Sequence, residues 1–302
     1  IQKCEEGMVV TNGMSYYKRD GENANSGAIN AEGDEGNFAN CSFIDCMAYT
    51  TGDEESSSGA ISWYGGNVNY TGCTFNNCFA SDGGAINSIH MSSVMSDCSF
   101  NNCFGTVKGG AIILQTDNTL VKDCNFTNCY VSGAYCGFGG AAVMSVMNGT
   151  ISNCIFKDCY SDSEGGALYS ENSVGLLVDS CSFLDNKAVY GGAISVRNSR
   201  DVLFNNTNFT NNSAFFGGVG YITQAVVSFD NCELSSNNAI NPNDEGTAGA
   251  GAIVNYNNYE CNISNSVIKD NTVKADYALG SVIINYGFMN LDNVSIFNNS
   301  LS

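Results

Sequence analysis

The sequence is poor in positive charge and in long apolar runs, and each shortage narrows the possible functions. Eleven Lys and Arg stand against 30 Asp and Glu, which gives a formal net charge of −19. Such a chain has no broad face that neutralises phosphates, so we expect no nucleic-acid partner and no binding to an anionic membrane surface. No run of 18 apolar residues appears, so we expect no membrane insertion within this segment.

Good helix formers are also scarce, whereas glycine, cysteine and apolar residues are plentiful. The 302 residues include 34 Gly and 15 Cys, and 43% of them are hydrophobic, which is enough for a large core. Gly, Asn, Ser and Thr fill the repeated segments, and all four are poor helix-interior residues. Ile1 is not Met and no signal-peptide pattern follows it, so we interpret the chain as a processed or excised segment.

A six-letter frame, x-x-Φ-x-x-[C/N] with Φ a large apolar residue, recurs ten times at intervals of 25 to 34 residues. CSFIDC begins at Cys41, CSFNNC at Cys98 and CSFLDN at Cys181. The sixth place is Cys in the first five copies and Asn in the last five. The third place is Phe in the first seven copies, and we expect these residues to form one core stack: Phe43, Phe75, Phe100, Phe126, Phe156, Phe183 and Phe209.

A second motif precedes each copy of the frame. GGAI begins at Gly83, Gly109 and Gly191, SGAI begins at Ser26 and Ser58, and the other five copies are variants of the same tetrapeptide. Two motifs that alternate at this period are typical of a solenoid, and short runs of alternating polarity indicate strands. We therefore predict an all-β fold, a single-domain right-handed parallel β-helix of about ten coils. Its repeats occupy residues 26–302, and residues 1–25 form an N-terminal cap or partial coil.

Coils of a β-helix stack about 4.8 Å apart, which places equivalent residues directly above one another. We expect the third-place Phe to form an aromatic column and the sixth-place Asn to hydrogen-bond to its copies above and below. Gly-Gly suits a tight corner where a side chain would collide. Cys can replace Asn because both are small and can face inward at a bend. Longer insertions at 50–58, 131–138 and 241–249 are expected to bulge from one edge as loops.

The alternation of GGA[ILV] with FxxN resembles the passenger repeat of the chlamydial polymorphic membrane proteins. GGAI at Gly191 followed by TNFTNN at Thr207 carries the resemblance, which covers roughly residues 26–300. It extends to adhesin-like repeat proteins of some archaea and protists. The resemblance implies a parallel β-helix displayed outside the cell, often in attachment. In half of the copies, Cys stands where the family motif has Asn.

Five successive frames carry Cys at both the first and the sixth place, and a sixth-place Cys never occurs without a first-place Cys. This co-occurrence favours disulfides within a coil, although pairing between adjacent coils also fits the Cα–Cα range of a disulfide. Free thiols acting as small buried hydrophobes are a third possibility. An odd total leaves at least one thiol unpaired, for which Cys4, Cys136 and Cys261 are candidates. The ten disulfide candidates are Cys41, Cys46, Cys73, Cys78, Cys98, Cys103, Cys124, Cys129, Cys154 and Cys159.

The glycan acceptor triplet N-x-S/T occurs ten times. Chance explains part of this number, because Asn, Ser and Thr are abundant. Asn40, Asn125 and Asn208 have the parity opposite to the neighbouring third-place Phe, so we expect these three to point outward. The ten glycosylation candidates are Asn40, Asn69, Asn125, Asn148, Asn205, Asn208, Asn211, Asn262, Asn293 and Asn298.

No arrangement of residues indicates a catalytic site, a metal site or a cofactor. Zinc is disfavoured because CxxC spacing is absent and His90 is the single histidine, which we interpret as a surface or wall residue. Asp53, Glu54 and Glu55 are considered for Ca²⁺, but their spacing matches no known calcium loop. We interpret the acidic groups of the expected loops as solvated carboxylates: Asp34/Glu35, Asp53–Glu55, Asp162/Glu164 and Asp244/Glu245.

Six aromatic residues are candidates for a sugar-binding wall, with ordinary packing as the plainer interpretation. They are Trp63, Tyr64, Tyr70, Tyr160, Tyr169 and Tyr190.

Together these features predict a non-enzymatic extracellular protein, secreted or at the cell surface, that acts as an adhesin-like rigid rod. Its expected partners are a host or neighbouring-cell surface, glycans, or copies of itself. The last frame, Val294–Asn299, has no amphipathic cap, so we expect either that the native chain continues or that another subunit covers this edge. The second option gives end-to-end assembly into a filament as a variant. The alternative is a polysaccharide-binding or polysaccharide-cleaving β-helix similar to pectate lyases. Cleavage would require a groove with three or more converging carboxylates and at least one Lys or Arg.

Overall fold

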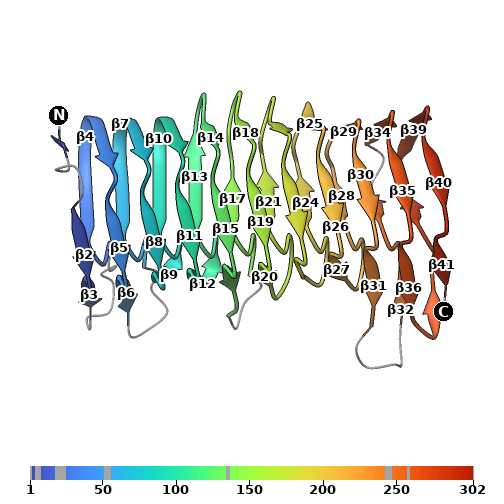
Figure 1. Ribbon diagram of the computed structural model, residues 1–302, viewed down its shortest axis with the longest axis horizontal. Coiled ribbons are helices and arrows are strands. Elements are labelled where there is room, and N and C mark those ends of the chain that lie inside the picture. The colour runs from blue at the N-terminus through green and yellow to red at the C-terminus, as the bar shows by residue number, and fades with distance from the viewer. Residues whose placement is uncertain are drawn as a thin grey trace.

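The computed structural model describes residues 2–3, 8–17, 25–50, 56–133, 137–241, 247–256 and 259–301. These residues form strands and turns without a helix. Figure 1 shows an elongated rod in which short strands from successive coils lie side by side and the two termini lie at opposite ends. Neighbouring strands run parallel, as expected when one coil follows another in the same direction.

One sheet takes a single short strand from each six-letter frame. These strands pair in register, so that Phe100 lies directly between Phe75 and Phe126. The eleven strands in order along the rod are β2 (Val9–Thr11), β5 (Ser42–Ile44), β8 (Thr74–Asn76), β11 (Ser99–Asn101), β15 (Asn125–Thr127), β19 (Ile155–Lys157), β23 (Ser182–Leu184), β26 (Asn208–Thr210), β30 (Glu233–Ser235), β35 (Val267–Lys269) and β40 (Ser295–Phe297).

A second sheet, of 18 strands, contains the segments that follow the glycine motif. It begins with the short β1 (Gln2–Lys3) and continues with three strands of 11 residues: β4 (Ile29–Ala39), β7 (Ile61–Thr71) and β10 (Ile86–Ser96). In later coils a bend divides the same stretch into two strands. These pairs are β13 (Ile112–Thr116) and β14 (Leu120–Lys122), β17 (Ala142–Met144) and β18 (Thr150–Ser152), β21 (Leu168–Glu171) and β22 (Leu177–Asp179), β24 (Ile194–Arg197) and β25 (Val202–Asn205), β28 (Gly220–Thr223) and β29 (Val227–Asp230), β33 (Ile253–Tyr256) and β34 (Glu260–Ser264), and β38 (Ile283–Asn285) and β39 (Phe288–Asp292).

The remaining strands follow the frame and complete each coil. A six-stranded sheet contains β3 (Met14–Tyr17), β6 (Met47–Thr50), β9 (Phe79–Asp82), β12 (Phe104–Lys108), β16 (Tyr130–Val131) and β20 (Tyr160–Ser161). Two smaller sheets contain β27 (Ser213–Ala214), β31 (Asn238–Ile240), β36 (Thr272–Lys274) and β41 (Ser300–Leu301), and β32 (Thr247–Ala248) and β37 (Tyr277–Ala278). The three predicted insertions all follow strands of this group (β6, β16 and β31), although residues 51–55, 134–136 and 242–246 lie outside the described part.

The predicted all-β parallel solenoid is confirmed, with one strand of the frame sheet for each of the ten predicted frames. The structure adds a coil that the frame did not reveal. Within the segment 1–25, predicted as a cap or partial coil, β2 and β3 pair in register with β5 and β6, and Val10 lies opposite Phe43. This coil has neither Phe at its third place nor Cys or Asn at its sixth, so the motif does not detect it.

Each frame turns a corner at its fifth place, where the backbone adopts the left-handed conformation. The φ angles are 54° at Asp45, 52° at Asn102 and 58° at Asn211. Asn and Asp tolerate this conformation better than other non-glycine residues. The corner therefore explains why Asn or Asp stands at the fifth place in nine of the ten frames, with Ser236 as the exception.

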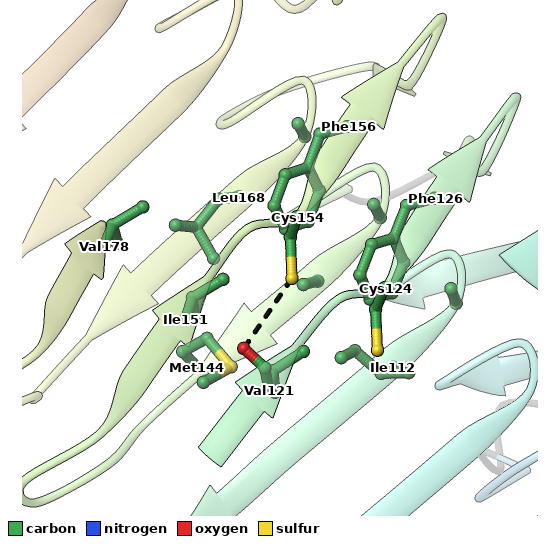
Figure 2. Close-up of a cluster of buried hydrophobic side chains, with 14 of the residues drawn as sticks. Ile112, Val121, Cys124, Phe126, Met144, Ile151, Cys154, Phe156, Leu168 and Val178 are labelled. Atoms are coloured by element: carbon green, nitrogen blue, oxygen red, sulfur yellow. Dashed lines mark hydrogen bonds between the residues drawn. The ribbon is translucent and has the colours of Figure 1, made fainter. Parts of the chain in front are cut away.

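The third-place phenylalanines form one fully buried column along the rod. Neighbouring rings from Phe43 to Phe209 have centroids 4.7 to 5.1 Å apart and planes within 13° of parallel. Leu234 and Ile268 continue the column in the later coils. Figure 2 shows two of its members, Phe126 and Phe156, in neighbouring coils of the apolar interior.

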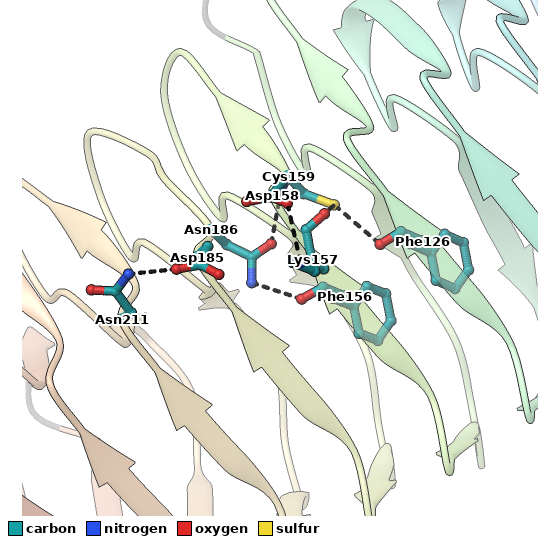
Figure 3. A network of polar contacts seen from close by, with 8 residues as sticks. All are labelled: Phe126, Phe156, Lys157, Asp158, Cys159, Asp185, Asn186 and Asn211. Atoms are coloured by element: carbon teal, nitrogen blue, oxygen red, sulfur yellow. Dashed lines mark hydrogen bonds and ion pairs between the residues drawn. The ribbon is translucent and has the colours of Figure 1, made fainter.

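The sixth-place asparagines form a buried hydrogen-bonded ladder. The amide nitrogen of Asn186 donates to the Asn212 side-chain oxygen at 2.9 Å and to the Phe156 carbonyl at 3.0 Å. Its oxygen accepts from the backbone N–H of Cys159 at 3.0 Å (Figure 3). The same arrangement repeats coil by coil to Asn299. The ladder therefore satisfies backbone groups that would otherwise be buried without partners.

The sixth-place cysteines reach the same kind of backbone acceptor. The Cys159 thiol donates to the Phe126 carbonyl at 3.7 Å (Figure 3). The Cys129 thiol donates to the Phe100 carbonyl at 3.5 Å. In each case the acceptor is the third-place carbonyl of the preceding coil, as it is for Asn186. A thiol and an amide therefore fill the same structural role at this corner.

Candidate functional site

The clearest candidate site is a groove lined mainly by aromatic side chains, which we call the tyrosine groove. Its volume is about 230 Å³. It lies over the later coils, on the outer face of the sheet that follows the glycine motif. Its lining residues are Tyr190, Phe216, Tyr221, Val254, Tyr256, Leu279, Ile284 and Tyr286.

Coil stacking brings these residues together from distant parts of the sequence. Tyr221 on β28, Val254 on β33 and Ile284 on β38 occupy one register column and face outward, between inward-facing core residues. Tyr256 lies two residues beyond Val254 on the same strand and therefore points to the same face. Tyr190 forms a β-bridge with Phe216 of the following coil, and each of the two residues directly precedes the glycine corner of its own coil. A residue type repeated at one coil position thus becomes a continuous stripe.

The aromatic rings of the groove contact one another along the rod. Ring centroids are 5.7 Å apart for Tyr190 and Phe216, 5.0 Å for Tyr190 and Tyr221, and 6.5 Å for Tyr221 and Tyr256. Tyr256 and Tyr286 meet edge to face at 5.4 Å. These contacts fix the ring orientations, so little side-chain entropy remains to be lost when a ligand binds.

The groove becomes more accessible toward its C-terminal end. Tyr256 is 43% exposed, Tyr286 is 55% exposed and Leu279 is 56% exposed. Tyr221 is half-buried, and burial raises the pKa of its phenol above the usual value. Tyr221 therefore stays neutral at physiological pH and keeps a hydroxyl that can donate and accept hydrogen bonds.

An ion pair between a buried carboxylate and a half-buried arginine borders the groove. Glu164 is only 6% exposed and accepts from Arg197 Nη2 at 2.7 Å and from Ser195 Oγ at 2.9 Å. In the strand register Ser195 lies beside Tyr221, and Arg197 lies beside Thr223. Arg197 Nε and Thr223 Oγ1 are buried without a hydrogen-bond partner. Both atoms are buried and their residues do not line the groove, so the polar groups that face a ligand there are the tyrosine hydroxyls within an otherwise apolar lining.

The buried Glu164 corrects the interpretation of the acidic groups. We predicted solvated loop carboxylates, but Glu164 is held inside by Arg197 and Ser195. Asp162 accepts from the backbone N–H groups of Gly133 and Gly137 at 2.8 and 2.6 Å. Asp34 and Glu35 lie within strand β4, not in a loop, because β4 runs through the glycine-rich stretch without a bend. Asp53–Glu55 and Asp244/Glu245 lie outside the described residues.

Burial excludes two of the six candidates for a sugar-binding wall. Trp63 and Tyr70 are fully buried, so neither can line a surface. Both point inward from the continuous strand β7, and Gly36 leaves room for the indole, since a Cβ there would come within 2.8 Å of the Trp63 ring. Tyr190 does line the tyrosine groove. Tyr169 occupies the same strand position as Tyr221, two coils closer to the N-terminus.

Two further members of the predicted wall lie elsewhere. Tyr160 ends a separate outer ladder with Phe104 and Tyr130, whose ring centroids are 4.5 Å apart. Tyr64 is half-buried on β7. Sequence reasoning missed Tyr221, Tyr256 and Tyr286, because they do not share one offset from the glycine motif: Tyr221 is in register with Val254, and Tyr256 lies two residues beyond it. His90 belongs to β10, but its side chain lies outside the described part.

The disulfide candidates are buried and carry no disulfide in this structure. They lie in two separate columns, one at the first place and one at the sixth place of the frame. In Figure 2, Cys124 and Cys154 occupy equivalent positions in neighbouring coils, and the Cys154 thiol donates to the Val121 carbonyl at 3.6 Å. Cys261 is also buried, whereas Cys4 and Cys136 lie outside the described residues.

The glycosylation candidates all lie away from the core. Asn205 and Asn262 are half-buried and the other eight are exposed. Asn69 lines a polar hollow of about 430 Å³ over β4, β7 and β10, together with Glu35 and Asn67.

Within the described ranges, no three or more His, Cys, Asp or Glu side chains cluster in a way that could hold a metal ion. The same ranges contain no helix with the length and apolar character needed to cross a membrane.

The stacked parallel strands and the inward columns define the molecule as a parallel β-helical solenoid. The chain belongs to the right-handed β-helix region family, which matches residues 27–187 and 106–268. This membership supports the predicted hand of the coil. No curated protein matches the chain.

Proposed function

We propose that this protein is a non-enzymatic, adhesin-like rod that is displayed outside the cell and binds carbohydrate on a neighbouring surface. The observation that carries the proposal is the tyrosine groove, in which four tyrosines and Phe216 from successive coils share one outer face. Tyrosine offers an apolar ring to the C–H faces of a sugar and a hydroxyl to its polar groups. Neutral or weakly charged glycans fit a chain of net charge −19 better than strongly anionic ligands do.

The rod itself supports an attachment role. A groove built on stacked strands is held by the same hydrogen bonds that hold the core, so its aromatic side chains are preorganised. The ten acceptor triplets support an extracellular location, since none of their asparagines is buried. Glycans on these asparagines are part of the proposal, and the intact mass of the native protein tests for them.

Binding accounts for the groove better than cleavage does. The right-handed β-helix family includes both enzymes and non-enzymes, so membership alone does not decide. Polysaccharide cleavage needs several carboxylates converging on the substrate. The described lining of the groove contains no carboxylate, and the nearby Glu164 is engaged by Arg197 and Ser195. We therefore expect no cleavage of polyuronates, with or without Ca²⁺, and release of unsaturated oligosaccharides would overturn the non-enzymatic assignment.

The binding proposal is tested on an array of immobilised glycans with the intact chain and two single variants. We expect Tyr256→Ala to weaken retention on the bound glycans about tenfold, because it removes the most exposed ring in the centre of the groove. The matched control is Tyr160→Ala, which removes an exposed tyrosine from a different ladder and should leave binding unchanged. Equal loss in both variants, or no retention of the intact chain on any glycan, would contradict the proposal.

End-to-end assembly is the second candidate, favoured by the surface of the last described coil. Ile296 is 45% exposed and Leu301 is 60% exposed, although both positions are interior in the preceding coils. Stacking a second copy on this coil would bury them. Sedimentation at increasing protein concentration should then reveal filaments, and Ile296→Glu should abolish them. A single species at all concentrations would remove this candidate.

A further inference from the structure

Two columns of buried thiols run through the N-terminal half of the rod. All of their members are at most 1% exposed. The first-place column consists of Cys41, Cys73, Cys98, Cys124, Cys154 and Cys181. The sixth-place column consists of Cys46, Cys78, Cys103, Cys129 and Cys159.

Within each column, every thiol has its closest thiol partners in the coils directly above and below. Ser99, which follows Cys98, pairs in register with Thr74 and Asn125, so Cys98 lies level with Cys73 and Cys124 in the adjacent coils. In the other column, Phe79, which follows Cys78, pairs in register with Met47 and Phe104, so Cys78 lies level with Cys46 and Cys103. Equivalent positions in adjacent coils are about 4.8 Å apart, which is within the Cα–Cα range of a disulfide.

Pairing within one coil is blocked by the fold. Cys41 precedes the extended strand β5 and Cys46 follows it, beyond the corner at Asp45. Three extended residues and a corner separate the two Cα atoms by on the order of 10 Å, beyond the reach of a disulfide. The first- and sixth-place columns are therefore separate, and the co-occurrence of the two cysteines in the sequence does not reflect a bond between them.

We propose that, under oxidising conditions, each column is joined by disulfides between adjacent coils, in a pattern fixed by the number of its members. The six thiols of the first-place column can all pair in only one way: Cys41–Cys73, Cys98–Cys124 and Cys154–Cys181. Any other choice leaves two thiols without a neighbour.

The sixth-place column has five members, so one thiol stays free. If the other four thiols all form disulfides, Cys78 and Cys129 must both be bonded. Leaving either of them free would also leave one of its neighbours without a partner. The free thiol is therefore Cys46, Cys103 or Cys159. Together the eleven column cysteines form five disulfides and retain one thiol.

The chemistry needs an oxidant, which we take to be a small-molecule disulfide such as oxidised glutathione. A column thiolate attacks it, releases one small thiol and forms a mixed disulfide. The neighbouring column thiolate then displaces the second small thiol and forms the protein disulfide. Each bond thus removes two electrons and two protons from the protein and reduces one disulfide to two thiols.

Bond formation must come before the coils close completely. Burial raises the pKa of the Cys103 thiol, and a buried protonated thiol is a poor nucleophile. The disulfides therefore form while the chain folds and are shielded afterwards. The inference rests on the proposed extracellular location for its relevance in the organism, but the geometry can be tested without it.

The test is to refold the reduced and denatured full chain in a mixture of reduced and oxidised glutathione. Remaining thiols are alkylated, and peptides from a non-reducing digest are identified by mass spectrometry. We expect the three first-place links named above. Cys78 and Cys129 should each be linked to a cysteine of an adjacent coil, and one column cysteine should be alkylated. A Cys41–Cys46 link, or eleven alkylated column thiols in the folded product, would overturn the proposal. Either outcome would leave glycan binding at the tyrosine groove unaffected, so failure here is distinguishable from failure of the proposed function.

Two variants sharpen the pairing rule. Cys73→Ser should release Cys41 as a free thiol and leave Cys98–Cys124 and Cys154–Cys181 intact. Cys232→Ser, which changes a buried cysteine outside the continuous columns, should leave all five links unchanged. Because the links are also mapped in the unchanged chain, the rule stays testable even if Cys73→Ser fails to fold. Re-pairing of Cys98 with a residue outside its column would contradict the rule.

Discussion

At the scale of single residues, the exchange of Cys for Asn at the sixth place follows from one shared contact. The Asn212 amide donates to the Phe183 carbonyl at 3.0 Å, and the Cys129 thiol donates to the equivalent Phe100 carbonyl at 3.5 Å. Asn makes further bonds that Cys makes only weakly, because the amide also accepts from the preceding coil. The amide ladder therefore stabilises the corner more than the thiols do, and Cys acts there as a smaller, more apolar replacement for Asn.

Removing one amide from the ladder should be costly. Asn212→Ala removes the side-chain hydrogen bonds that Asn212 makes with the Phe183 carbonyl, the Asn186 N–H and the Asn237 oxygen. We expect a loss of about 2–4 kcal/mol in the free energy of unfolding, measured by urea denaturation. Asn212→Cys should cost less than Asn212→Ala, since a thiol restores the bond to the carbonyl.

The matched control for this substitution is Asn208→Ala, which removes an exposed asparagine from the adjacent strand β26. Its effect should stay within about 0.5 kcal/mol. Equal effects of Asn208→Ala and Asn212→Ala would show that the buried ladder does not stabilise the rod.

Residue parity predicted the interior columns correctly but not every side chain. The alternation within Val94–Phe100 is enough to place Cys98 and Phe100 inside. The burial of Trp63 and Glu164 was not predicted. The Trp63 indole fits inside because glycine leaves room for it, and the Glu164 carboxylate is tolerated because it pairs with Arg197. Both conditions depend on residues in neighbouring coils, which a single stretch of sequence does not display.

At the scale of the coil, the glycine motif serves two different purposes. Its first position has a positive φ in the copies that begin with Gly, 65° at Gly139, but Ala250 holds the same position in a later coil with a φ of 57°. Its second position is Gly in all ten copies. A Cβ on Gly140 would lie 2.0 Å from the carbonyl oxygen of Gly166 in the next coil. Close approach between coils, not backbone conformation, therefore fixes the second glycine.

Alanine substitutions at adjacent glycines separate these purposes. Gly140→Ala must push two coils apart, and we expect it to destabilise the protein by about 3 kcal/mol. Gly139→Ala requires a left-handed alanine and places its Cβ 2.4 Å from the Ala142 carbonyl oxygen of the same coil, and it should cost about 1–2 kcal/mol, because the natural Ala250 indicates that one coil can accommodate this change without moving its neighbour. Thermal unfolding of the two variants compares them directly. If Gly139→Ala is the more damaging change, the assignment of the two glycines is wrong.

The motif predicted the number and order of the coils, but not all of their strands. The continuous strands β4 and β7 contain Gly33, Gly36, Gly65 and Gly66, which look like corner residues in the sequence. Pairing with neighbours over the full 11 residues keeps these strands extended. Local propensity was overruled by registry between coils, as is common for strands.

At the scale of the whole molecule, the stacking of coils places the repeated residues in columns, some in the core and some on the surface. Ten frames at about 4.8 Å each give a rod on the order of 50 Å long. The Phe column, the amide ladder, the thiol columns and the tyrosine groove all arise because equivalent positions in successive coils are neighbours. The groove was hard to predict because its members from successive coils lie 26 to 35 residues apart and only some of them are tyrosines.

The most direct test of this registry is zero-length carbodiimide cross-linking of the native protein, which joins an amine to a carboxylate already in contact. Lys269 on β35 lies 3.0 Å from Glu233 on β30, one coil away. Mass spectrometry should therefore find the Lys269–Glu233 link as the main product at this lysine. Links from Lys269 to carboxylates several coils away, with none to Glu233, would contradict the stacking on which the groove and the thiol columns depend.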